Sequence, residues 1–206
     1  MNRVVVFPFA CLALIITASG AAAEDWKLLK EKDGVAVYTR AVAGERIEEL
    51  RAVMKMRTTV DRLVAVHLDG DNQAKWFPKC VESRVIRRMS PTNLWIYRAI
   101  ANPWPIDDRD YVIDVNLTRD TKTGDAFVSF ADVKGALAET RGRVRMKKMA
   151  GYWKFSPTGD GQVLVTFVMR FDPGGSTPAS FINMALSRIG TDTFDGLYRY
   201  ALASGG

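Results

Sequence analysis

Hydrophobic and polar residues alternate along most of the chain, in short runs separated by turn-forming residues. A period of two residues predicts strands that bury one face. Because the connections between successive runs are short, neighbouring strands are expected to pair antiparallel. We expect about eight strands, at residues 35–40, 45–56, 81–89, 93–100, 110–118, 126–133, 144–155 and 163–171.

Three other segments repeat apolar residues at spacings of three and four, which is typical of amphipathic helices. They are residues 26–32, residues 60–68, and a long segment from Thr177 to about residue 203. Thr58 and Thr59 precede the second helix, and the hydroxyl of one of them is available to cap it. Pro178 is tolerated in the first turn of the third helix. The last helix is long enough to cover the concave face of a curled sheet, so we expect an α+β fold.

Two segments are expected to interrupt this sheet and let it curl. Gly151, inside an apolar run, indicates a bulge or bend. The segment Asn102-Pro103-Trp104-Pro105 indicates a rigid loop between two strands.

The first 23 residues have the pattern of a secretory signal peptide. Arg3 provides the positive start, residues 4–18 are almost continuously apolar, and residues 21–23 are three alanines. A membrane anchor is the alternative, but a spanning helix needs about 20 apolar residues. We therefore expect cleavage to leave residues 24–206 as a single, monomeric domain that is periplasmic or secreted.

Positive charge is in modest excess. The chain has a net charge of +6, which falls to +5 when the segment containing Arg3 is removed. Basic residues gather at residues 84–88 and 141–148, where we expect solvated faces; the alternative is transient contact with anionic lipid head groups, at about 1 kcal/mol per charge. Nucleic acid is a poor fit, because the sequence carries no motif typical of its readers.

Candidate catalytic residues are few. His67 is the single histidine, and we expect it at the surface or near a helix end. Cys80, the one cysteine of the mature chain, is expected to be a buried small hydrophobe. Arg109 is expected to form a salt bridge with an aspartate of residues 107–110 at the start of a strand. We therefore expect no metal site, no cofactor and no enzymatic activity.

Several motifs resemble those of the START (steroidogenic acute regulatory protein-related lipid transfer) family. In order they are Trp76-Phe77-Pro78, Arg109-Asp110-Tyr111-Val112, residues 151–157, and Phe171-Asp172-Pro173-Gly174-Gly175 ahead of residues 178–183. The resemblance implies a helix-grip fold, in which a curved sheet wraps the C-terminal helix around a hydrophobic tunnel. It also implies a lipid or another apolar small molecule as ligand, without an obligatory cofactor.

The polar anchor in such a tunnel is less clear. The resemblance implies an acid in the strand before the arginine-aspartate motif, where this chain has Arg98. We expect Arg98 to pair with Asp114 on the next strand. Because successive side chains of a strand point to opposite faces of the sheet, Tyr111 and Val112 lie on different faces. The sequence leaves open which of these faces is concave. The candidate ligand-binding residues are Arg98, Asp114, Trp95, Tyr97, Val112, Trp153, Phe167, Ile182, Leu186 and Ile189.

The function expected is binding and transport, or sequestration, of one hydrophobic ligand. Release would require movement of the last helix or of residues 102–108. Two alternatives stay open: an enzyme similar to the polyketide cyclases and aromatases of the wider helix-grip superfamily, and an envelope protein that meets an acidic partner through residues 141–148.

Overall fold

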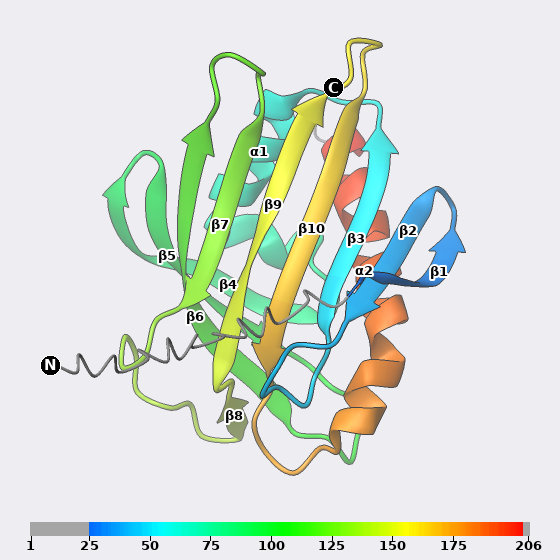
Figure 1. The fold of residues 1–206 in the computed structure, drawn as a ribbon. Helices are drawn as coiled ribbons and strands as arrows, with labels where there is room; N and C mark the ends of the chain where they lie inside the picture. Colours follow the sequence, from blue (N-terminus) through cyan, green and yellow to red (C-terminus); the bar gives the residue numbers. More distant parts are fainter. Residues whose placement is uncertain (1–24, 204–206) are drawn as a thin grey trace, which may run out of the picture.

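The structure, a computed structural model that describes residues 25–203, is a single antiparallel sheet curved around a long helix (Figure 1). The strand order is β1-β2-β3-β10-β9-β7-β6-β5-β4, and β8 pairs parallel with β6. The strands are β1 (Lys27–Lys32), β2 (Val35–Arg40), β3 (Glu49–Met56), β4 (Cys80–Ser90), β5 (Asn93–Ile100), β6 (Asp108–Arg119), β7 (Ala126–Asp132), β8 (Arg143–Arg145), β9 (Lys148–Pro157) and β10 (Val163–Asp172).

The helices are α1 (Val60–Leu68), the 3-10 helix η1 (Gly70–Lys75) and α2 (Ala179–Ala203). The expected α+β helix-grip architecture is confirmed, with α2 packed on the concave face of the sheet. The capping prediction also holds, because the Thr59 hydroxyl accepts a hydrogen bond of 3.1 Å from the backbone N–H of Arg62.

The prediction of a helix at residues 26–32 is wrong, because this segment is β1 and pairs with β2. Asp33 and Gly34 connect the two strands, and both have a positive φ. That backbone is typical of the two-residue turn that closes a hairpin. The apolar side chains of Leu28 and Leu29 are exposed, so β1 has no buried face to show the two-residue period. The Asp33-Gly34 turn is therefore a better indication of a strand at residues 27–32 than the spacing of their apolar residues.

Gly151 does not form the expected bulge. The register between β9 and β10 is unbroken from Pro157 opposite Val163 to Lys148 opposite Asp172. A Cβ at residue 151 would overlap the carbonyl oxygen of Val168 and approach the Phe130 ring to 2.7 Å. Glycine is therefore needed here for close packing rather than for a change of register.

The second half of α2 lies directly on its surroundings. At Gly190, an added Cβ would lie 2.9 Å from a methyl carbon of Val37, on β2. At Gly196 it would overlap the carbonyl oxygen of Trp76, which follows η1. The side chains of Phe194 and Leu197 between and beyond these glycines are fully buried. From Gly190 onward the helix is therefore held by close contacts, although the side chains of Asp192 and Thr193 border a cavity.

His67 lies in the last turn of α1, near a helix end as expected, but it is inside the protein and not at the surface. Its side chain is 2% exposed, and its ring lies 4.6 Å from the ring of Trp153 and 5.1 Å from those of Trp76 and Phe155. Its Nδ1 lies 2.8 Å from the carbonyl oxygen of Leu63. A carbonyl only accepts, so Nδ1 carries the proton and Nε2 is bare. Burial lowers the pKa of His67 to about 3, so the ring is neutral at physiological pH.

The contact at Gly196 yields a prediction with an unusual sign. In an exposed helix, Gly→Ala stabilises by about 1 kcal/mol. Here we expect Gly196→Ala to lower the free energy of unfolding by about 1–3 kcal/mol, because the methyl group has no room. Thr191→Ala in the same helix is the control and should be neutral or slightly stabilising. Urea denaturation would measure both, and a stabilising Gly196→Ala would contradict the close contact.

His67 should make stability depend on pH. Its pKa is about 3 in the folded state and about 6.5 when unfolded. Above about pH 6.5 the His67 ring is neutral in both the folded and the unfolded chain, so its titration does not reduce the free energy of unfolding. As the pH falls below this value, only the unfolded chain gains the proton, so stability falls by up to about 1.4 kcal/mol per pH unit.

The variant His67→Gln removes this titration while leaving the carboxylates, which titrate in both proteins, unchanged. We therefore expect the stability difference between wild type and His67→Gln to shrink between about pH 6.5 and 4. Urea denaturation at several pH values would measure that difference. A difference that stays constant with pH would show that His67 is not held neutral by burial.

Candidate functional site

The larger internal cavity lies between the first half of α2 and the sheet, and its volume is about 270 Å³. Its other walls are the ends of β9 and β10 and the segment that follows β5. Small-molecule sites in proteins are concave and mostly apolar, with volumes upward of about 300 Å³. This cavity lies close to the lower end of that range. Most of the lining is apolar, including Ile106, Met146, Phe171, Ile182, Ala185 and Ile189.

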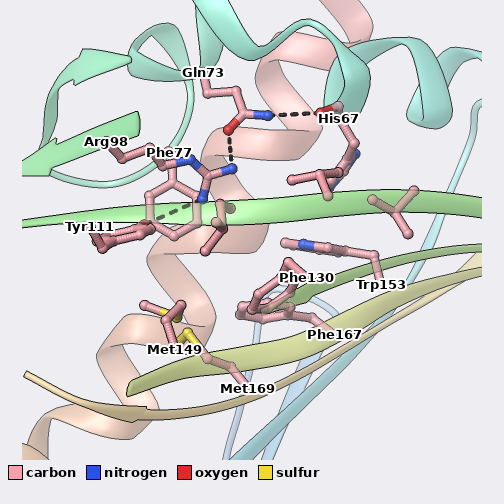
Figure 2. A pocket seen from close by; sticks show the side chains of 13 residues that line it. His67, Gln73, Phe77, Arg98, Tyr111, Phe130, Met149, Trp153, Phe167 and Met169 are labelled. Carbon is pink, nitrogen blue, oxygen red and sulfur yellow. Dashed lines mark hydrogen bonds between the residues drawn. The ribbon is translucent and has the colours of Figure 1, made fainter. Parts of the chain in front are cut away.

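A smaller cavity of about 20 Å³ lies deeper, under α1 and η1 (Figure 2). This volume holds about one water molecule. Four residues line both cavities and so form the partition between them: Phe77, Tyr111, Met149 and Met169. The two cavities are therefore successive parts of one interior space, the outer part apolar and the inner part partly polar.

Arg98 is the charged group of the inner cavity, and it is 7% exposed. Its Nη2 donates to the Gln73 side-chain oxygen, and its Nη1 lies 3.4 Å from the Tyr111 hydroxyl. The guanidinium also lies over the Phe77 ring, 4.6 Å from the ring centre. Gln73 is itself held by a 2.8 Å hydrogen bond to the carbonyl oxygen of His67. Figure 2 shows this chain of hydrogen bonds from α1 through η1 to β5.

The predicted pair of Arg98 and Asp114 is wrong. Arg98 lies opposite Tyr111 in the β5–β6 register, whereas Asp114 lies opposite Trp95. Successive side chains of a strand point to opposite faces, so the two groups lie on different sides of the sheet. Asp114 instead accepts a 2.6 Å hydrogen bond from the Asn93 side chain.

The candidate ligand-binding residues divide between the two faces. Arg98, Trp153 and Phe167 line the inner cavity, and Ile182 and Ile189 line the larger one. Leu186 is fully buried but lines neither. The remaining four lie away from both cavities, on the convex face: Trp95, Tyr97, Val112 and Asp114. The concave face of β6 is therefore the one that carries Tyr111.

Sequence reasoning missed several cavity residues. Gln73, Met149 and Met169 are not among the candidates, and Phe77 is named only as a motif residue. Tyr111 belongs to the aromatic residues that could line a cavity, but it is not among the ten candidate ligand-binding residues. One signal was available for Tyr111: once Arg98 is placed inside, a residue directly opposite it on an antiparallel neighbour must also face inward. Nothing comparable marks Gln73, whose position depends on the path of η1.

The basic residues near position 145 are only partly a solvated face. Arg145 forms a 2.7 Å ion pair with the buried Asp110, and Arg143 forms one of 2.8 Å with Glu82. Burial alone would raise the pKa of Asp110, but the hydrogen bonds and charge of Arg145 hold it below its usual value. Lys148 pairs with Glu45. Much of this positive charge is therefore neutralised within the protein.

The expected salt bridge of Arg109 is also wrong. Arg109 donates hydrogen bonds to the backbone carbonyl oxygens of Pro173 and Gly174 and to the hydroxyl oxygen of Thr177. In each of these bonds the donor nitrogen lies 3.2 Å from the acceptor oxygen. It therefore ties the start of β6 to the segment that leads into α2. Asp110, the neighbouring acid, pairs with Arg145 instead.

Among residues 25–203, no group of three or more histidine, cysteine, aspartate or glutamate side chains is placed to hold a metal ion. Cys80 is buried as expected, and burial raises the pKa of its thiol. Within the same residues, no helix has the length and hydrophobicity needed to cross a membrane.

The chain is similar to proteins of several bacteria and of humans. It is 33% identical to an uncharacterized protein of Pseudomonas aeruginosa over 185 residues, which cover 90% of this chain and 91% of that one. A STAR-related lipid transfer protein fragment from Xanthomonas axonopodis shares the fold with a TM-score of 0.80 and 28% identity, over 85% of this chain and 98% of that one.

More distant structures share the fold alone. Human StAR-related lipid transfer protein 5 superimposes with a TM-score of 0.77 and 17% identity, over 91% of this chain and 90% of that one. An aromatase/cyclase of a Streptomyces species does so at 0.58 and 10% identity, over 77% of this chain and 98% of that one. The family model of the START domain matches residues 9–197. The chain therefore belongs to the START domain family.

Proposed function

We propose that this protein encloses one hydrophobic ligand between α2 and the sheet, transports or sequesters it, and performs no covalent chemistry on it. The observation that carries the proposal is the apolar cavity of about 270 Å³ at the first half of α2. Removing apolar ligand surface from water contributes about 25 cal/mol per Å², which is the driving force for binding. The similar protein of known structure from Xanthomonas axonopodis is named for lipid transfer, which supports a lipid as the ligand.

The absence of catalysis is proposed from the side chains that face the interior. The single histidine is neutral, with a pKa of about 3, and therefore is a poor base at neutral pH. The raised pKa of Cys80 keeps that thiol protonated and poorly nucleophilic. The fold itself does not decide the matter, because an aromatase/cyclase shares it. A protein-binding role for residues 141–148 is less well supported, because Arg143 and Arg145 are already paired.

Export is the second part of the proposal. The signal peptide predicted at residues 1–23 lies outside the described residues, and its support is the sequence pattern alone. Cleavage there would place the domain in the periplasm or outside the cell. An apolar ligand carried across an aqueous compartment needs a shielded interior, which fits the cavity described above.

The third part is transient contact with an anionic membrane at the mouth of the cavity. Trp104 lies between two lining residues, Pro103 and Ile106, and is 93% exposed. On the facing helix, Phe181 is 62% and Met184 69% exposed. Exposed aromatic and apolar residues beside a cavity are typical of surfaces that meet a membrane or partner. We define Trp104, Phe181 and Met184 as the apolar rim.

Native mass spectrometry with organic extraction tests ligand binding directly. Protein purified from its own periplasm should carry a hydrophobic molecule at a ratio of one to one. Ala185→Trp should remove that molecule, because the new ring fills the cavity that Ala185 lines. Ala203→Trp, at the exposed end of the same helix, is the matched control and should retain it. A folded wild-type protein that carries nothing and takes up no lipid would contradict the proposal.

The apolar rim should control the rate of transfer rather than the capacity for ligand. We expect Trp104→Ser combined with Phe181→Ser to slow transfer of a fluorescent fatty acid between anionic vesicles about tenfold, because less apolar surface enters the membrane. The number of binding sites should not change. Leu28→Ser with Leu29→Ser, which removes two exposed apolar side chains of β1, is the control. Equal transfer rates in all three proteins would rule out the rim as the contact surface.

A further inference from the structure

The inner cavity contains a cation without a balancing anion. Arginine stays protonated in proteins and has five N–H donors. Arg98 uses two groups for hydrogen bonds, Nη1 to Tyr111 and Nη2 to Gln73, while its Nε is buried and has no partner. No carboxylate within residues 25–203 forms an ion pair with it. Its two hydrogen-bond partners are both neutral side chains.

The surroundings do not supply a negative charge either. Burial raises the pKa of Tyr111 and of Cys80, so neither group ionises near neutral pH. His67, which shares the cavity, is neutral. A charge removed from water costs several kcal/mol unless a partner compensates it. Arg98 is therefore an incomplete ion pair inside an apolar interior.

Its position also fits the far end of a ligand. The inner cavity with Arg98 adjoins the apolar cavity across the partition of Phe77, Tyr111, Met149 and Met169. Methionine is unbranched and flexible, so two of these four side chains adapt readily to a guest. A molecule with a polar end at Arg98 and an apolar body in the larger cavity would satisfy both environments.

Gln73 holds the guanidinium in place for such a partner. Because the Gln73 amide nitrogen donates to the carbonyl oxygen of His67, its oxygen is turned toward Arg98. The stacked ring of Phe77 restrains the other side of the guanidinium plane. The charged group is thus oriented before any ligand arrives, which lowers the entropic cost of binding.

From these observations, and resting on the proposed function, we infer that the ligand is an amphipathic molecule with one anionic head group, a carboxylate or a phosphate monoester, that forms an ion pair with Arg98. Because the inner cavity is only about 20 Å³, the side chains of Met149 and Met169 must move aside for the head group to reach Arg98, while the apolar body remains between α2 and the sheet. A cavity of about 270 Å³ suits a single chain or small ring system better than a two-chain phospholipid.

Three probes of equal chain length test this inference: dodecanoate, dodecyl phosphate and 1-dodecanol, each titrated calorimetrically into the full protein. Wild type should bind at least one anion about tenfold to a hundredfold more tightly than the alcohol, as expected for a hydrogen-bonded charge pair. The preferred anion identifies the source of the charge. Arg98→Met should abolish that preference and leave the affinity for the alcohol within about twofold, because the apolar wall is intact.

Two further variants separate a local ion pair from general effects. Arg188→Met removes an exposed cation from the outer wall of the larger cavity and should keep the preference. Arg98→Lys keeps the charge but not the planar fork, and should retain part of the preference. If Arg98→Met unfolds, the comparison of the three probes on wild type and on Arg98→Lys still decides the matter.

The possible failures are distinguishable. If wild type binds all three probes equally, or prefers the alcohol, the anionic head group is wrong and hydrophobic binding stands. If Arg188→Met loses the preference as fully as Arg98→Met, the attraction is a general one and the inner site is wrong. If no probe binds to the folded protein, the proposed function fails together with the inference.

Discussion

The close contact between the second half of α2 and the structure beneath it is the constraint on which the rest of the interior depends. Gly190 against Val37 and Gly196 against the Trp76 backbone leave no room even for a methyl group at normal distance. A helix fixed so closely along half its length keeps its direction through the other half. The first half therefore extends over the end of the sheet without collapsing onto it, and the larger cavity lies beneath.

The periodicity of apolar residues predicts most of the strands and the long helix. It does not show which face of β5 and β6 is concave. Both faces of these strands are apolar. The concave face belongs to the main core, while Tyr97, Ala99 and Val112 form a second small core on the convex face, covered in part by Ala136 and Leu137. In an amphipathic strand the polar residues mark the face that meets solvent. A strand that is buried on both faces has no such residues, so its sequence does not show which face is concave.

The alternation of side chains along a strand nevertheless limits which residues can line a cavity together. Tyr97 and Arg98 are neighbours on one strand, so a set of cavity residues that contains both cannot be correct.

The hydrogen bond between Gln73 and Arg98 could not be predicted for a different reason. Gln73 reaches Arg98 across 25 positions of sequence, from a short 3-10 helix that hydrophobic patterning does not mark. Likewise, His67 is placed in an aromatic cluster by the packing of α1 on β9, a contact between distant segments.

The hydrogen bonds of Arg109 bear on how a guest gains access. A swing of α2 about its seated half would have to separate Pro173, Gly174 and Thr177 from this guanidinium, losing three interactions together. Residues 102–108 are held mainly by bonds of their own, since Asn102 bonds to Asp108 and to the backbone of Asp107. One bond ties this loop to the same guanidinium, because Arg109 Nη1 donates to the carbonyl oxygen of Asp107. Displacing the loop would therefore break one hydrogen bond of Arg109, whereas displacing the start of α2 would break three.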